Sequence, residues 1–326
     1  MNKVLRILSF VMIMVVFAAC SSKDDKIDFN KLSNEEKIAL LDARIKENPK
    51  DAALYFQRAT IFHEMGNTKE ALFNVRKAIE FDKKKVEYYI LEADVFFERG
   101  ETSMAFDALN QAISVDKKNL DAHLRMAEIS LDLQDYNRAM ESLKNVLDID
   151  KVNAKAYFMR GMIFKETGDT LRAVEDYKKA IEYKSDYEQV FEELGNLYAV
   201  KGDGLAVDYY KSTININPKN VNAMYNLGLF YQENGAIQQA LDMYQRVLKI
   251  NPGYANAIYA VGYINYEEKK DYNTALDCFN KTIKADSLYY EAYGSRAKVY
   301  QKLGKTAEAK QDLQTYERIK NAVTQR

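Results

Sequence analysis

Histidine and cysteine, which often catalyse reactions or bind metals, are few in this sequence of 326 residues. Its two histidines, His63 and His123, fall in different predicted helices, so we expect no paired metal ligands. Cys278 has no histidine near it, which favours a packing residue over a nucleophile. The segment 202–204 (Gly-Asp-Gly) is similar to part of a phosphate-binding loop, but the sequence lacks a Gly-Lys-Ser/Thr segment, so we interpret it as a turn. We therefore expect neither an enzyme nor a metal or cofactor site.

The composition favours a nearly all-helical globular protein. The chain has 13 glycines and 3 prolines, far below their average share, and both residues are costly inside helices. Hydrophobic residues make up 47% and charged residues 29% of the chain, values that exclude disorder for most of it. The formal net charge of −1 argues against a dedicated nucleic-acid binder, which carries a basic excess.

The first twenty residues have the layout of a secretory signal peptide. Lys3 and Arg6 precede an apolar run over residues 7–17, and two alanines and Cys20 follow it. This run is too short to span a bilayer, which takes about 20 residues. Residues 16–20 (Val-Phe-Ala-Ala-Cys) resemble a bacterial lipobox, although Phe17 stands where leucine is preferred. The resemblance implies that residues 1–19 are removed and that Cys20 carries acyl chains that anchor the protein in a membrane.

Residues 20–31 are predicted to be the lipidated cysteine and a flexible tether, since few of them are apolar. Ser21 resembles the residue that sorts enterobacterial lipoproteins to the outer membrane. The segment 23–25 (Lys-Asp-Asp) resembles the export tether of some Gram-negative surface lipoproteins, and the alternative is an ordinary solvated linker. Together these features imply a lipid-anchored protein of the cell envelope at the outer membrane, on its periplasmic face or at the cell surface.

From residue 52 onward the chain repeats a pattern about every 34 residues. Position 20 of each unit is alanine, and position 8 is alanine or glycine. Position 24 carries a larger apolar or aromatic side chain, from Val75 in the first unit to Leu313 in the last. Small residues let two helices approach closely, because a larger side chain there would cost about 1–3 kcal/mol of overpacking. The eight units are residues 52–85, 86–119, 120–153, 154–187, 188–220, 221–254, 255–289 and 290–323.

A helix–turn–helix period of this length resembles the tetratricopeptide repeat (TPR). The resemblance covers residues 52–323 and implies an all-α TPR α-solenoid, a right-handed superhelix of about eight repeats plus an N-terminal helix. That capping helix is expected over residues 32–49, with Ser33 as its N-cap and Pro49 at its end. The last helix is expected over residues 306–323. Its inward-packing stripe is predicted to be Leu313, Tyr316 and Ile319.

In this family the first helix of each repeat lines a concave binding groove, mainly with positions 2, 5, 9, 12 and 13. Apolar side chains at these positions are not needed inside a repeat, which indicates a binding surface. We expect a protein or peptide partner there, with tyrosines as contact faces and two asparagines that bond an extended peptide backbone. The alternative is that the apolar residues pack between neighbouring first helices. The expected groove residues are Phe158, Met162, Tyr225, Leu229, Tyr259, Tyr263, Tyr266, Asn222 and Asn256.

The two resemblances together imply a non-enzymatic adaptor that recruits a protein or peptide partner into an envelope assembly. Lipid-anchored relatives serve in outer-membrane protein insertion, in pilus assembly and in the control of peptidoglycan hydrolases. Some TPR domains bind chaperone tails with clamp lysines, but the corresponding positions hold Glu192, Tyr225, Tyr259 and Tyr263, so chaperone binding is not expected. The alternative function is a surface-exposed receptor or ligand-capture lipoprotein, which segment 23–25 favours. The partner's identity and the oligomeric state stay open.

Overall fold

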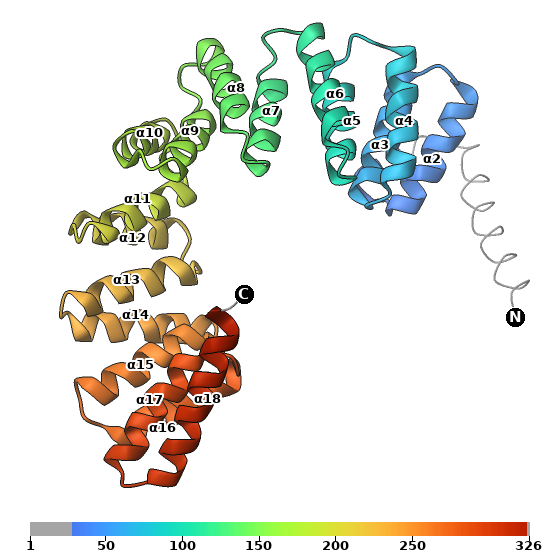
Figure 1. Ribbon diagram of the computed structural model, residues 1–326. Helices are drawn as coiled ribbons and strands as arrows, with labels where there is room; N and C mark the ends of the chain where they lie inside the picture. The colour runs from blue at the N-terminus through green and yellow to red at the C-terminus, as the bar shows by residue number, and fades with distance from the viewer. Residues whose placement is uncertain (1–27, 325–326) are drawn as a thin grey trace, which may run out of the picture. The chain divides into compact units, whose positions relative to one another are not determined.

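The computed structural model describes residues 28–324, which are α-helical apart from their turns. A 3-10 helix, η2 (Phe29–Lys31), precedes one unpaired helix, α2 (Asn34–Glu47), and eight helix pairs then follow in chain order (Figure 1). This confirms the expected all-α array of helix–turn–helix repeats after an N-terminal helix. The pairs are α3 (Ala52–Glu64) and α4 (Thr68–Phe81), α5 (Val86–Glu98) and α6 (Thr102–Val115), α7 (Leu120–Asp132) and α8 (Tyr136–Ile149), α9 (Ala154–Glu166) and α10 (Thr170–Tyr183), α11 (Glu188–Val200) and α12 (Leu205–Ile216), α13 (Val221–Glu233) and α14 (Ile237–Ile250), α15 (Ala255–Glu267) and α16 (Tyr272–Ala285), and α17 (Tyr290–Lys302) and α18 (Thr306–Thr324).

The described chain forms two compact units, with the division after Ile129. The N-terminal unit contains α2 to α6 and most of α7, and the C-terminal unit contains the end of α7 and α8 to α18. In the N-terminal unit α4 packs on α3 and α5. In the C-terminal unit each of the second helices α10, α12, α14 and α16 packs on its own first helix and on the first helix of the next repeat. No helix in residues 28–324 combines the length and the apolar character needed to cross a membrane.

Small residues set the approach of the two helices in each repeat. All eight alanines of the position 20 column are buried, and so are the alanines and glycines of the position 8 column. Position 24 then fills the space between one repeat and the next. Its buried side chains in the first seven repeats are Val75, Leu109, Leu143, Tyr177, Tyr210, Tyr244 and Phe279.

The eighth repeat departs from this pattern, and the inward packing expected for Leu313 is wrong. Leu313 is 40% exposed, although the expected burial of Ile319 is confirmed. In the earlier repeats the next first helix covers position 24, whereas no helix follows α18 in the part of the chain that the structure describes. Tyr316 is half-buried instead, with its Cδ2 atom 3.1 Å from the place of a Cβ on Gly294.

The turn between the two helices of a repeat uses a residue with positive φ. In the first repeat Gly66 has φ +71°, and the next residue, Asn67, caps α4 by accepting the backbone N–H of Glu70. Glycine takes this conformation without the steric cost of a Cβ atom. Gln134 (φ 58°) and Lys270 (φ 55°) hold it in the third and seventh repeats, so these two turns are strained.

The N-terminal helix α2 (Asn34–Glu47) lies inside the expected residues 32–49, beginning two residues later and ending two residues earlier. Ser33 caps it, and the Glu36 side chain accepts the Ser33 backbone N–H in return, which completes a capping box. Leu41 and Ile45 of α2 are buried in a cluster with two residues of α3. Phe29 packs on the same cluster, so the ordered chain extends into the segment expected to be a tether. The expected signal peptide, the expected lipidation site Cys20 and the rest of that segment lie outside the described residues.

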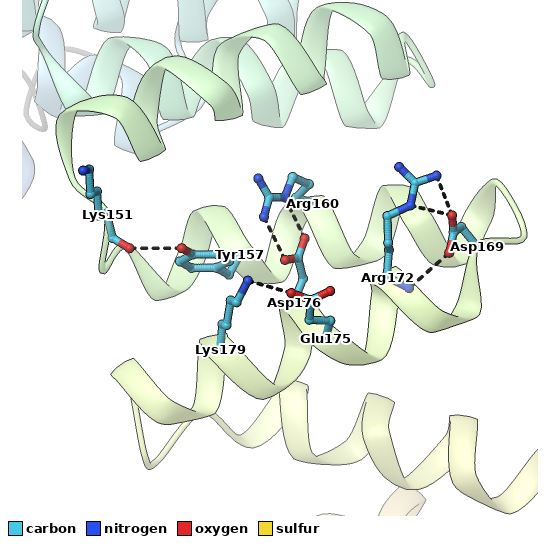
Figure 2. Close-up of polar contacts among 8 residues, drawn as sticks. All are labelled: Lys151, Tyr157, Arg160, Asp169, Arg172, Glu175, Asp176 and Lys179. Atoms are coloured by element: carbon cyan, nitrogen blue, oxygen red, sulfur yellow. Dashed lines mark hydrogen bonds and ion pairs between the residues drawn. The ribbon is translucent and has the colours of Figure 1, made fainter.

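A buried ion pair joins the two helices of the fourth repeat. Arg160 of α9 donates from Nε to Asp176 Oδ2 at 2.7 Å and from Nη2 to Oδ1 at 2.8 Å, across to α10 (Figure 2). The Asp176 side chain is only 4% exposed, so this two-point contact satisfies a carboxylate that has little access to water. Arg296 holds Asp312 in the same way in the eighth repeat. These pairs fix the register of the two helices.

Candidate functional site

The residues predicted to bind a partner lie on the first helices of the C-terminal unit. Among these helices, α11 contacts α13 and α15 contacts α17, so consecutive first helices lie side by side. We call the surface formed by α9, α11, α13, α15 and α17 the first-helix face. The second helices pack behind these first helices. Their aromatic residues at position 24, such as Tyr177 and Tyr244, lie in the core between one repeat and the next.

Three predicted residues are central rings of aromatic triplets. Each lies between a ring of its own second helix and the ring of the residue just before the next repeat. The Phe158 centroid is 5.9 Å from that of Tyr177 and 5.1 Å from that of Tyr187. The corresponding centroid distances are 5.8 and 5.5 Å for Tyr225, with Tyr244 and Tyr254, and 5.6 and 5.0 Å for Tyr259, with Phe279 and Tyr289.

The triplets support the alternative interpretation for these three residues, because their rings are half-buried in contacts between repeats. Met162 and Leu229 are likewise half-buried against the core of the C-terminal unit. Tyr266 packs on Tyr272 of its own repeat, with ring centroids 5.8 Å apart. Each of the six therefore contributes to packing and offers only part of its surface to a partner.

The exposed members of the predicted set are Tyr263, Asn222 and Asn256. Tyr263 is 37% exposed, and its ring centroid is 6.2 Å from that of Tyr259. Both asparagines are exposed, and Asn222 Oδ1 accepts a hydrogen bond from Tyr254 Oη at 3.4 Å. Tyr263 and Asn256 thus present an aromatic face and an amide from one helix, α15, as recognition of an extended peptide requires.

Tyrosines of the sixth and seventh repeats form one cluster, which we define as Tyr225, Tyr254, Tyr259 and Tyr289. Burial, together with the nearby Tyr254 and Tyr259, raises the pKa of Tyr225 to about 12. Burial also raises the pKa of Tyr259, against the opposing effect of its hydrogen bond with Ser295, whose Oγ lies 3.0 Å from Tyr259 Oη. The tyrosine cluster is therefore neutral, and the exposed Tyr263 contacts it through Tyr259.

The fifth repeat interrupts the aromatic pattern with a polar group that the sequence analysis did not assign. Position 5 is Glu192 there, and the place of the third ring is taken by Asn220. Asn220 Nδ2 donates to Glu192 Oε2 at 2.9 Å and to Glu188 Oε1 at 2.8 Å, and Asn217 Nδ2 also donates to Glu188 Oε1 at 2.8 Å. In the sequence, this group is indicated by Glu192, which stands at position 5 between the aromatic residues of the adjacent repeats.

Two asparagines at the clamp positions of other TPR domains bond within the protein. Asn226 Nδ2 donates to Asn196 Oδ1 at 3.1 Å, and Tyr210 Oη donates to the same oxygen at 2.9 Å. No lysine occupies the clamp positions. The two asparagines therefore join α11, α12 and α13 through hydrogen bonds, which is a structural role.

The other candidate groups have ordinary surroundings. His63 Nε2 lies 2.8 Å from Glu98 Oε1, and the buried His123 bonds the Lys117 carbonyl with its Nε2 at 3.1 Å. Cys278 is buried as a packing residue, and burial raises the pKa of its thiol. Across residues 28–324 no group of three or more histidine, cysteine or acidic side chains is placed to hold a metal ion.

Comparison with known families finds tetratricopeptide repeats in the chain. Tetratricopeptide-repeat models match residues 154–187, 221–254 and 290–322, and a model of anaphase-promoting complex (cyclosome) subunit 3 matches residues 64–146. The matched repeats begin at the first residues of α9, α13 and α17. Together with the helix pairs, these matches show that the fold is a TPR array. A search of curated proteins found no match.

Solved structures of TPR proteins share this fold at low sequence identity. The C-terminal part of a TPR protein from Cytophaga hutchinsonii is 16% identical with a TM-score of 0.57, over 71% of this chain and 95% of that one. PilF of Pseudomonas aeruginosa is 17% identical with a TM-score of 0.55, over 64% and 96%. The Cut9–Hcn1 hetero-tetramer of the anaphase-promoting complex is 18% identical with a TM-score of 0.50, over 89% of this chain and 57% of that one. At these identities the likeness concerns the fold alone.

Proposed function

We propose that the protein is a non-enzymatic adaptor, anchored to the bacterial outer membrane through lipid on Cys20, that binds a protein or peptide partner on its first-helix face. A TPR array is typical of proteins that bind other proteins. The observation that carries the proposal is the combination of an exposed aromatic ring, Tyr263, which packs on the tyrosine cluster, with the exposed amide of Asn256 on the same helix.

This arrangement suits a partner segment that is extended and partly apolar. Tyr263 offers a wide face whose orientation is supported by Tyr259, so little side-chain entropy is lost on binding. Asn256 offers both a donor and an acceptor to a peptide backbone. Glu188 and Glu192 add negative charge on the first helix of the fifth repeat, two repeats before Tyr263, with no lysine or arginine paired to either among the described residues.

Photocrosslinking in cells tests the partner site. A photoreactive phenylalanine at position 263 is expected to give a discrete adduct with another protein. The control is the same residue at Tyr183, which is 41% exposed on a second helix, compared with 37% for Tyr263. Adducts of equal yield at both positions, or none at position 263, would remove the support for a partner at this face.

The anchor is tested separately, through Cys20. The native chain is expected to incorporate a labelled fatty acid and to fractionate with the outer membrane, because acyl chains supply the membrane affinity. A Cys20→Ser chain is expected to lose both properties while its helices still form. Unchanged labelling of the Cys20→Ser chain would contradict the anchor without touching the partner site.

The second candidate function, a surface-exposed receptor, is favoured by Lys23, Asp24 and Asp25. Protease added to intact cells is expected to spare the protein if it faces the periplasm. Digestion that stops when segment 23–25 is replaced by Gly and Ser would favour the receptor function instead.

A further inference from the structure

The outer face of α4, in the first repeat, differs from every other second helix. It borders a hollow of about 310 Å³ whose lining includes Phe73 and four cations, Lys69, Arg76, Lys77 and Arg99. Glu80 is the one carboxylate in the lining. Phe73 is 54% exposed, so the aromatic ring reaches solvent beside these cations. We call this surface the α4 face.

Phe73 stands at position 22 of its repeat, where the other seven repeats carry an acidic or amide side chain. Those residues are Asp107, Glu141, Glu175, Asp208, Asp242, Asp277 and Gln311. A solvated second-helix position has no need of a phenyl ring, and exposing one costs hydrophobic free energy. The first repeat therefore departs from the repeat pattern at an exposed position.

The second half of the first repeat is also more basic than the corresponding part of the other repeats. Residues 68–85 contain six lysines and arginines against three acidic residues, a net charge of +3, whereas the corresponding segments of the other repeats lie between 0 and +1. The whole chain has a formal charge of −1. The positive charge is thus local to α4 and the turn that follows it.

These cations keep donors available to an outside anion. Lys69 has no acidic partner within residues 28–324, and the Arg76 side chain is 56% exposed although its Nε donates to Glu92 at 3.0 Å. Arg99 Nε likewise donates a hydrogen bond to Glu101 Oε1 at 2.7 Å. The other guanidinium N–H groups of both arginines are then available to phosphate oxygens. Lys77 is held by Glu80 at 2.7 Å.

We propose that the α4 face docks on anionic phospholipid headgroups, with the cations on phosphates and Phe73 inserted at the membrane interface. A basic surface with an exposed aromatic ring has the chemistry of interfacial binding. The segment between Cys20 and Asp28 spans at most roughly 27 Å when extended, so a lipid on Cys20 would hold the first repeat close to the bilayer. That last step rests on the proposed anchor, whereas the charge and the exposed ring do not.

Vesicle co-sedimentation tests the proposal with an unlipidated chain of residues 21–326, which keeps every described helix. Vesicles that contain phosphatidylglycerol in phosphatidylcholine are expected to bind several-fold more protein than phosphatidylcholine alone. High salt is expected to remove most of this difference, because screening weakens exposed charges. Equal binding to the two vesicle types, or no binding to either, would overturn the proposal.

Two variants assign the binding to the α4 face. Phe73→Glu restores the type of residue that the other repeats carry, so the fold is retained, and Lys69→Glu removes the unpaired cation. Each is expected to lower the fraction bound several-fold. Lys310→Glu, which makes the same charge change as Lys69→Glu at an exposed position of α18, is expected to leave it unchanged. Binding that falls equally in all three variants would show nonspecific charge attraction and contradict a defined face. None of these positions belongs to the partner site, so photocrosslinking at Tyr263 reports on that site independently.

Discussion

A Cβ atom placed on Gly161 would lie 2.6 Å from Cδ1 and Cε1 of Tyr177. The corresponding distances are 2.7 Å between Gly195 and Tyr210 and 2.6 Å between Gly228 and Tyr244. Repeats with alanine at position 8 carry valine or leucine at position 24 instead. The tyrosine ring thus takes the room of the missing methyl group, which explains why two distant columns of the sequence change together.

Gly161→Ala is expected to destabilise the protein by about 1–3 kcal/mol, because the added methyl overlaps the Tyr177 ring. Adding Tyr177→Leu should recover part of this loss, since alanine with leucine is the combination found in the second and third repeats. Urea unfolding of the two single variants and the double variant measures the coupling. Additive effects of the two substitutions would contradict the proposed exchange of space.

Breaking the Arg160–Asp176 pair is expected to cost about 3–5 kcal/mol, because Arg160→Met leaves a buried carboxylate without its partner. The matched control is Arg172→Met, which breaks the exposed Arg172–Asp169 pair at the start of the same helix α10 (Figure 2). That variant should shift the urea midpoint little, because exposed ion pairs contribute little. Similar shifts for both variants would mean that burial does not set the strength of this contact.

Stability is expected to fall as the pH rises from about 10 to about 12. Burial raises the pKa of Tyr225 to about 12 and also raises the pKa values of Tyr177, Tyr210 and Tyr244, whereas tyrosine in an unfolded chain titrates near 10. The unfolded chain therefore loses its protons first, so the stabilisation is complete below about pH 10 and is lost through this window.

Urea midpoints recorded alongside tyrosinate absorbance measure this effect. The pH dependence should be weaker in a Tyr225→Phe chain, which cannot ionise at that position. A midpoint that is constant between pH 10 and 12, or an unchanged dependence in the variant, would show that these phenols are not held neutral by the fold.

Lys270→Gly is expected to stabilise the protein by about 1 kcal/mol, because Lys270 holds a positive φ of 55° that glycine adopts without strain. Gly235→Ala, at the same turn of the preceding repeat with φ +74°, should destabilise it by a similar amount. Thermal unfolding of both variants tests the sign. If Lys270→Gly lowers the melting temperature, the flexibility gained by the unfolded chain outweighs the strain.

The fold follows from the sequence because its pattern is periodic. The position 20 alanines, such as Ala173, mark the helix contacts in every repeat, and Ser33 marks the start of α2. Leu313 was misplaced because its burial depends on a following helix and not on its own repeat. The role of Phe73 could not be predicted from its own repeat, because its exposure beside cations is visible only in the structure.

The site was less predictable than the fold. Repeat position alone places Tyr225, Tyr259 and Tyr263 on the first helix, but it does not tell which rings the neighbouring repeats cover. Tyr254 and Tyr289 precede first helices, and their rings take up much of the surface of Tyr225 and Tyr259. Tyr263, one turn along α15 from Tyr259, escapes that contact and stays exposed.

The most direct test of the adaptor function is the affinity for the protein captured at position 263. Tyr263→Ala is expected to weaken binding about 10-fold or more, equivalent to about 1.4 kcal/mol, because the substitution removes an exposed aromatic contact. The matched Tyr183→Ala chain should bind as tightly as the parent, and both variants should unfold at the parent's midpoint. Equal affinities of the Tyr263→Ala, Tyr183→Ala and parent chains would contradict a partner site on the first-helix face.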